Sequence, residues 1–116
     1  MNTIMSHSVN LPKKGMLLAH LNVCSLRNKV HELCHLVESN NIHILAISES
    51  HLDSSFDDSE VEMHGYNLFR KDIDKNGGGV LIYVQNHIPA KVRYDLMKNE
   101  IEALWLQIQL PNLKPI

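Results

Sequence analysis

The stretch at residues 42–52 constrains the fold of this chain more than any other. Residues 42–47 are apolar apart from His43, and the run ends at Ser48 and Glu49 in a polar segment. A run of this length is too short for an ordinary helix and is typical of a strand buried on both faces. The sequence therefore predicts a buried strand with Glu49 at its carboxyl end. A carboxylate there is well sited to hold a hard metal ion, although spacing alone favours an ordinary, solvated strand end.

The residues before this strand predict a strand–helix–strand unit. Residues 16–23 form an apolar run of strand length, and residues 28–40 repeat apolar side chains at helical spacing. Ser25 or Asn28 can cap the start of the helix, and residues 40–41 can end it because asparagine tolerates the left-handed conformation. This order implies that the two strands pair in parallel and that the helix covers one face of the sheet.

The rest of the chain reads as strands and loops. Residues 53–63 are polar and predict an irregular loop or one short helical turn, and residues 65–71 and 80–84 predict a hairpin around a glycine-rich turn. Residues 91–94 predict a weak edge strand, and residues 101–108 alternate as a further strand. The fold class is therefore α/β, with a mixed sheet of five or six strands and one main helix. One face of such a sheet is poorly covered, which indicates either self-association or a truncated domain.

Length and composition exclude several classes of protein. The 116 residues fit one domain at residues 16–110, with a flexible leader at 1–15 and a tail at 111–116. A formal charge of −2 argues against a general polyanion-coating protein. Cys24, Cys34 and the eight histidines show no zinc-binding spacing, so we expect reduced thiols. No apolar run approaches the roughly 20 residues of a membrane span, and no secretory signal is evident. We therefore expect an intracellular protein, nuclear or cytoplasmic, without membrane association.

Four ordered blocks of sequence carry a resemblance to a known family. They are LNVCSLRNK at 21–29, LAISESHL at 45–52, GYNLFRKD at 65–72 with GGGVLIYV at 77–84, and EALWL at 102–106. Together they resemble the endonuclease/exonuclease/phosphatase superfamily, and most closely the endonuclease domain of LINE-like non-LTR retrotransposons. The resemblance implies the N-terminal half of a four-layer α/β sandwich of two sheets. It also implies cleavage of DNA phosphodiesters with Mg²⁺ or Mn²⁺, a cation that would stabilise charge on the phosphate and activate water.

The resemblance assigns roles to individual residues. Glu49 matches the metal-binding glutamate of the family, and Asn22 matches an asparagine that lies in the site beside the metal and the catalytic groups. The alternative for Asn22 is an amide that satisfies the turn after its strand. Glu102 matches a glutamate that supports a catalytic histidine in deoxyribonuclease-type relatives, which implies a supporting role behind the site. Arg27 and Lys29 are candidate contacts to DNA phosphate, or simply the solvated start of a helix.

At other matched positions, the resemblance gives weaker evidence for a functional role. Arg70 could bind DNA phosphate or pair with Asp72. Cys24 stands where several relatives place Asp or Asn; because thiols are poor Mg²⁺ ligands, we assign it no role and expect a small buried thiol. We expect Trp105 to belong to the core rather than to stack on bases. The glycines at 77–79 predict a turn whose backbone could approach a ligand.

The family domain is about twice as long as this chain. Its second half brings a catalytic Tyr, an Asp-x-Asn motif and a terminal Ser-Asp-His, and no Asp-x-Asn follows Glu102 here. We therefore expect an endonuclease fragment that is inactive alone and that needs the missing half, or self-association, for stability. The alternative is a non-catalytic interaction module that keeps the fold and dimerises. A member of the superfamily acting on phospholipid or sugar phosphate is a third interpretation.

Overall fold

The computed structural model describes residues 15–72, 78–98 and 102–109. Its elements, in chain order, are β1 (Leu18–Asn22), α1 (Val30–Asn40), β2 (Ile44–Ser48), the short 3-10 helix η1 (Asp58–Glu60), β3 (Tyr66–Lys71), β4 (Val80–Gln85), β5 (Ala90–Val92), the 3-10 helix η2 (Tyr94–Leu96) and β6 (Leu106–Ile108). The expected leader up to residue 14, the turn at 76–77 and the tail at 111–116 lie outside the described residues.

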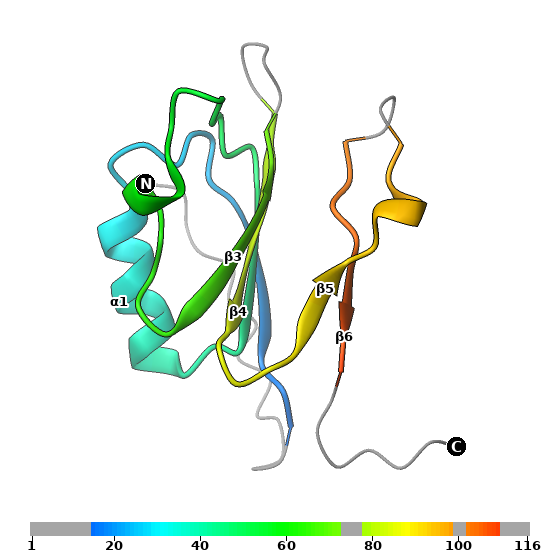
Figure 1. Cartoon of the computed structure of the whole chain (residues 1–116). Coiled ribbons are helices and arrows are strands. Elements are labelled where there is room, and N and C mark those ends of the chain that lie inside the picture. Colours follow the sequence, from blue (N-terminus) through cyan, green and yellow to red (C-terminus); the bar gives the residue numbers. More distant parts are fainter. Residues whose placement is uncertain (1–14, 73–77, 99–101, 110–116) are drawn as a thin grey trace.

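β1, β2, β4 and β3 form a mixed four-stranded sheet in that order. β1 pairs in parallel with β2, whereas β4 pairs antiparallel with both β2 and β3. The parallel pair is joined through α1, which packs on one face of the sheet (Figure 1). The strand–helix–strand unit and the hairpin predicted from the sequence are thus confirmed.

The hydrophobic core lies between α1 and the sheet. Leu33 and Val37 of α1 are buried, and so are the inward-facing residues of β2 and β4: Leu45, Ile47, Leu81 and Tyr83. The apolar stripe of the helix therefore meets alternate residues of the strands, as the two periodicities require.

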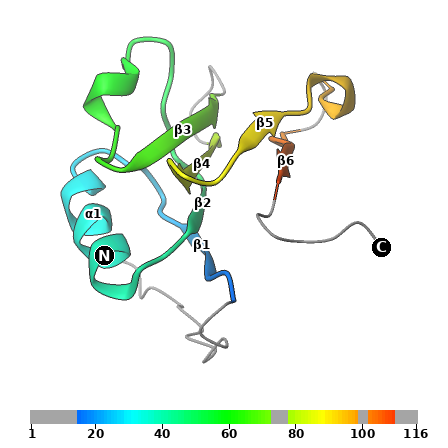
Figure 2. The same cartoon turned by 60° about the horizontal axis from the view of Figure 1, so that its bottom comes forward.

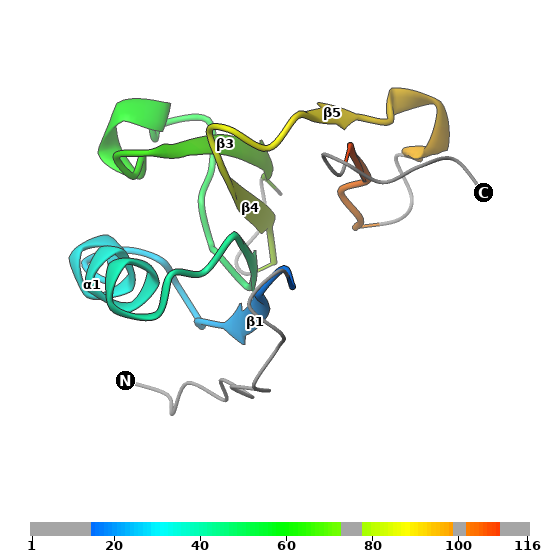
Figure 3. The same ribbon diagram turned by 90° about the horizontal axis from the view of Figure 1, so that it is seen from below.

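β5 and β6 form a separate two-stranded sheet. They lie on the side of the four-stranded sheet opposite α1 (Figures 1 and 3). In Figure 2, β5 and β6 lie to the right of β3 and β4. The expectation of one sheet with five or six strands is therefore wrong. After the inner strand β4, the chain turns at residues 86–89 and leaves the first sheet, and β5 pairs with β6 instead.

Several local expectations need correction. Neither Ser25 nor Asn28 caps α1: Lys29 occupies the N-cap without a side-chain cap bond, and Asn28 is left-handed at φ 62°. Asn41 does end the helix in the left-handed conformation, at φ 48°. The last strand is shorter than expected, because β6 begins only at Leu106.

Two side chains are more exposed than the sequence suggests. The thiol-bearing Cys24 is exposed, because it lies in the left-handed turn after β1 rather than in the strand. Trp105 is 49% exposed, because it precedes β6 on the second sheet and not in the core beneath α1. Within the described part of the chain, no helix is long and apolar enough to cross a membrane.

Candidate functional site

Asn22 and Glu49 lie at the same edge of the four-stranded sheet. The parallel register places Asn22 opposite Ser48, the residue before Glu49, and the Val23 N–H donates to the Ser48 carbonyl at 3.1 Å. The carboxyl ends of adjacent parallel strands are where α/β sheets place their ligands. The Oδ1 atom of Asn22 accepts the Cys24 N–H at 3.3 Å. The amide therefore satisfies its turn, while its Nδ2 donates to no group among the described residues.

The segment that follows β2 is held by backbone hydrogen bonds on both sides. The N–H groups of residues 25–26, in the loop after β1, donate to the carbonyls of Glu49 and Ser50 at 2.8 Å each. The N–H groups of Ser50 and His51 donate to the carbonyls of residues 79 and 78, at 3.2 and 2.8 Å. The backbone beneath Glu49 is thereby fixed before any ligand arrives, which is what a precise binding site needs.

Left-handed backbone is concentrated in these same loops. Apart from Asn41 at the end of α1, the positive-φ residues other than glycine among the described residues all follow β1 or β2: Cys24, Ser25, Asn28, Glu49 and His51. Such conformations are disfavoured for residues with a Cβ and cost about 1–3 kcal/mol each, and they cluster at functional sites. The concentration of strain supports a functional role for this edge of the sheet.

The Glu49 carboxylate is half-exposed and has two donors on one oxygen. Its Oε2 accepts from Nε2 of His51 at 2.9 Å and from the Gly78 N–H at 3.2 Å. These hydrogen bonds, the one from His51 first, lower the pKa of Glu49 below its usual value. Within the described residues, Oε1 accepts no hydrogen bond. The side chain is therefore an ionised carboxylate with one oxygen available to a cation.

Glu102, in the segment before β6, binds the glycine next to Gly78. Its Oε1 accepts the Gly79 N–H, so two consecutive amides, of Gly78 and Gly79, are bound by carboxylates from different parts of the chain. Gly79 has φ +94°, and a Cβ there would lie 2.4 Å from Oγ of Ser50. This position consequently requires glycine, and Glu102 lies at the same edge of the sheet as Glu49.

The three predicted phosphate-binding cations are in different situations. The guanidinium of Arg27 lies 4.6 Å from the centroid of the Phe56 ring, and the residue is exposed. Lys29 donates from Nζ to the Val23 carbonyl, so its ammonium group secures the end of β1.

Arg70 is engaged inside the protein. Its guanidinium forms a two-point hydrogen bond with Asp72, from Nε to Oδ1 at 3.1 Å and from Nη2 to Oδ2 at 2.5 Å. It also donates to Oδ1 of Asp58 at 3.1 Å and to the Asp53 carbonyl at 3.0 Å. Arg70 therefore pairs with Asp72, one of the two roles open from the sequence, and links β3 to the loop before it.

Three contributors to this edge were missed in the sequence analysis. His51 bonds to Glu49, and the Nε2 atom of His20 lies 3.1 Å from Oγ of Ser48. The buried Oγ of Ser50 has no hydrogen-bond partner among the described residues. A histidine two residues after a strand-end glutamate was a usable signal for the first. The other two depend on pairing between strands, which spacing along the chain does not reveal.

The donor set fits a hard cation held mainly by water. Mg²⁺ typically takes one or two carboxylates and keeps several waters, whereas structural zinc takes four nitrogen or sulfur ligands. Over the described ranges, no group of three or more His, Cys, Asp or Glu side chains could hold a metal ion. Glu49 and Asn22 offer carboxylate and amide oxygens, which are the ligand types that Mg²⁺ and Mn²⁺ prefer.

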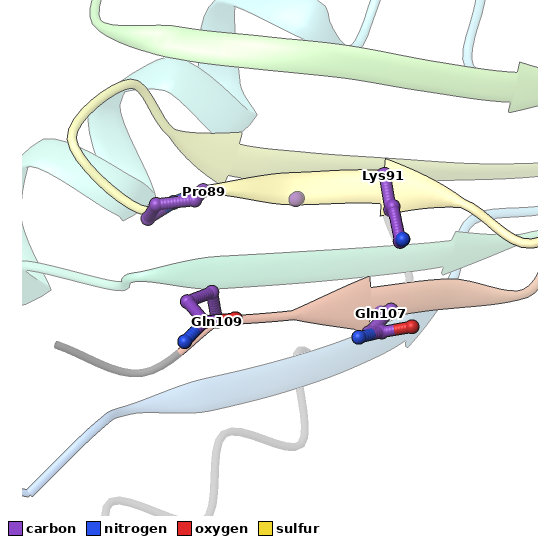
Figure 4. Close-up of a pocket in the computed structure, with 5 residues that line it drawn as sticks. Pro89, Lys91, Gln107 and Gln109 are labelled. Atoms are coloured by element: carbon purple, nitrogen blue, oxygen red, sulfur yellow. The ribbon is translucent and has the colours of Figure 1, made fainter. Parts of the chain in front are cut away.

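A separate cavity lies on the β5–β6 hairpin. It has a volume of about 250 Å³ and is lined by Pro89, Ala90, Lys91, Gln107 and Gln109 (Figure 4). None of the residues proposed from the sequence lines it. The cavity and the strand-end edge that carries Glu49 are therefore distinct features.

In comparisons with known proteins, no family model matches this sequence and no curated protein matches it.

Proposed function

We propose that this chain is the metal-binding, N-terminal half of a Mg²⁺-dependent DNA endonuclease of the LINE-like retrotransposon type, and that it does not cleave DNA by itself. The observation that carries the proposal is the ionised Glu49 carboxylate next to Asn22, at the carboxyl ends of two parallel strands. The first two of the four blocks of family resemblance contain these two residues.

The arrangement of layers supports the corresponding fold. α1 covers one face of the four-stranded sheet, and the β5–β6 pair lies on the other (Figure 3). This is the order in which the first half of a four-layer sandwich would begin: helix, sheet, then the first strands of a second sheet. Glu102 ties the two sheets together at the edge that carries Glu49.

The residues of this edge have complementary roles in the proposal. A bound Mg²⁺ would supply positive charge to the scissile phosphate and lower the pKa of a bound water. Glu49 would hold the cation through Oε1, and Asn22 would donate from Nδ2 to a phosphate oxygen without adding charge. Of the three predicted cations, Arg27 is the best placed to bind a flanking phosphate, because it is exposed and its contact to a described residue is with the Phe56 ring.

We expect no strand cleavage from the 116 residues alone. In the resembled family, the general acid and base come from the Asp-x-Asn and Ser-Asp-His motifs of the second half, and the segment after Glu102 holds neither. Removing members of a cooperative catalytic group costs several orders of magnitude in rate. Metal binding does not need those groups, so it should survive.

The test is Mn²⁺ binding, followed by electron paramagnetic resonance of the free ion, combined with a plasmid-nicking assay. Wild-type protein should bind one Mn²⁺ saturably, and Glu49→Gln should weaken binding more than tenfold, since a carboxylate ligand is lost. Glu62→Gln is the control for the same change of side chain, because Glu62 is an exposed glutamate in the loop before β3, away from Glu49 in the sequence. Equal affinity in wild type and Glu49→Gln would refute the metal site. Nicking that requires Glu49 would refute the proposed inactivity.

A second candidate function is a non-catalytic module that dimerises. It is favoured by large apolar side chains left exposed outside the core: Leu18 at 61%, Tyr94 at 76% and Trp105 at 49%. Exposed apolar side chains mark an interaction site where they form a contiguous patch. Sedimentation velocity with and without EDTA distinguishes the two functions. A dimer that is indifferent to EDTA and to Glu49→Gln would favour the module, whereas a monomer would exclude it.

A further inference from the structure

His51 lies where it can control the Glu49 side chain. The two residues have nearly the same left-handed backbone, at φ 57° for Glu49 and φ 56° for His51. Ser50 between them and Leu52 after them are both buried and anchor the turn from below. The imidazole consequently folds back on the carboxylate, and its Nε2 lies 2.9 Å from Oε2 of Glu49.

We propose that His51 is a positioning residue for Glu49, holding Oε2 so that Oε1 is presented to a divalent cation as a single-oxygen ligand. The inference rests on the proposed function, because it gives His51 a task only if Glu49 binds a cation. It adds a residue that acts through the ligand rather than on the metal or on DNA.

The hydrogen bonds around Gly78 make this arrangement cooperative. The His51 N–H donates to the Gly78 carbonyl at 2.8 Å, and the Gly78 N–H donates to Oε2 of Glu49 at 3.2 Å. The imidazole closes the ring of contacts on the same oxygen. Fixing a glutamate side chain in advance removes conformational freedom that binding would otherwise have to remove.

The chemistry of imidazole suits the task. An imidazole carries a ring N–H that can donate to a carboxylate oxygen, and Nε2 of His51 lies at hydrogen-bond distance from Oε2 of Glu49. A lysine or arginine at this position would neutralise Glu49 and repel the metal ion. Partners that orient a metal ligand are a general feature of metal sites, and their loss typically weakens metal affinity about 10–100-fold.

The experiment measures Mn²⁺ affinity of the full chain in four variants: His51→Ala, His51→Gln, Glu49→Gln and the double variant Glu49→Gln/His51→Ala. His64→Ala is the matched control, since His64 is an exposed histidine without a hydrogen bond to a described residue. We expect His51→Ala to weaken binding about 10–100-fold, and His51→Gln, which keeps an N–H donor, to recover most of the loss. In the Glu49→Gln background, His51→Ala should change affinity little, because its effect passes through Glu49.

The outcomes separate this inference from the proposed function. If Glu49→Gln loses Mn²⁺ while both His51 variants bind as tightly as wild type, His51 does not position the ligand and the metal site stands. If wild-type protein binds no Mn²⁺ saturably, both proposals fail. Thermal melting of each variant shows whether the fold is kept, and His51→Gln decides the question should His51→Ala unfold.

Discussion

The two faces of the four-stranded sheet are built differently. On the face covered by α1, the central residues Leu45, Ile47, Leu81 and Tyr83 are almost completely buried. On the opposite face, Ile44, Ala46 and Ile82 are only partly buried, and β1 presents His20 and Asn22 to solvent. Val84 is the buried exception on that face, near the turn that leads to β5.

Polar side chains follow the same division. On the α1 face, Arg70 and Tyr83 have their polar groups bonded within the protein. On the other face, His20 and Asn22 stay exposed near the edge that carries Glu49. The α1 face therefore supplies most of the stability, whereas the candidate site with Asn22 and Glu49 lies where the opposite face meets the strand ends.

Replacing one isoleucine by alanine on each face of the sheet tests this difference in burial most directly. Ile47→Ala should lower the free energy of unfolding by about 2–5 kcal/mol, because a fully buried side chain leaves a cavity. Ile44→Ala, three residues earlier on the opposite face of β2, should cost clearly less, because its side chain is only partly buried. Urea unfolding followed by circular dichroism measures both. Equal losses would show that the second face is as much a core as the first.

The contact between Gly79 and Ser50 tests the strand-end edge. Gly79→Ala should destabilise the protein by about 2–4 kcal/mol, since it adds left-handed strain and an overlap of the new Cβ with Oγ of Ser50. Gly65→Ala has similar strain, at φ +86°, but its added Cβ would meet no described atom within 4 Å beyond its chain neighbours, so it should cost only about 1–2 kcal/mol.

A double variant isolates the overlap at this edge. Ser50→Ala removes an Oγ that has no hydrogen-bond partner in the described part of the chain, and it leaves Cβ of residue 50 at 3.7 Å from the new methyl group. Gly79→Ala/Ser50→Ala should therefore be more stable than Gly79→Ala alone. Strictly additive effects in urea unfolding would mean that this contact does not limit the position.

Two arginines sharpen the contrast between structural and exposed cations. Arg70→Ala should cost about 1–3 kcal/mol, because it leaves Asp72 without its main partner. Arg27→Ala should cost less than about 1 kcal/mol, the usual range of an exposed cation–ring contact. Thermal unfolding measures both changes. A larger loss of stability in Arg27→Ala than in Arg70→Ala would show that Arg27 is the more stabilising of the two arginines.

The buried hydroxyl of Tyr83 on the α1 face should make the stability of the protein depend on pH. Its hydroxyl donates to the Val61 carbonyl at 2.5 Å, so Tyr83→Phe should cost about 1 kcal/mol at neutral pH. Burial raises the pKa of Tyr83 well above its usual range. The unfolded chain releases this proton near pH 10 while the folded protein keeps it, so stability is fully present below that pH and falls as the pH rises.

As the pH rises into the alkaline range, the free energy of unfolding should therefore fall more steeply in wild type than in Tyr83→Phe. Urea unfolding at several pH values between pH 8 and about pH 11 measures this change in stability. Parallel curves for the two proteins would show that Tyr83 ionises as readily when folded as when unfolded.

Much of the fold could be predicted because its signals are local. Helical spacing within residues 30–40, a left-handed Asn41 and strand-length apolar runs each depend on a few neighbouring residues. The location of Asn22 and Glu49 at one edge also followed, because parallel strands joined through a helix end on the same side. Their roles in binding metal and DNA stay predictions.

Other features depend on contacts between distant parts of the chain. Whether β5 joins the first sheet or pairs with β6 is a choice of hydrogen-bonding partner, and the apolar pattern of a short strand fits both. The bonds from Gly78 and Gly79 to Glu49 and Glu102 connect residues more than 20 positions apart. The sequence by itself determined the element order and the edge that carries Glu49. Only the tertiary structure decided which groups surround that carboxylate, because long-range packing, not local propensity, selects the left-handed turn that folds His51 back onto it.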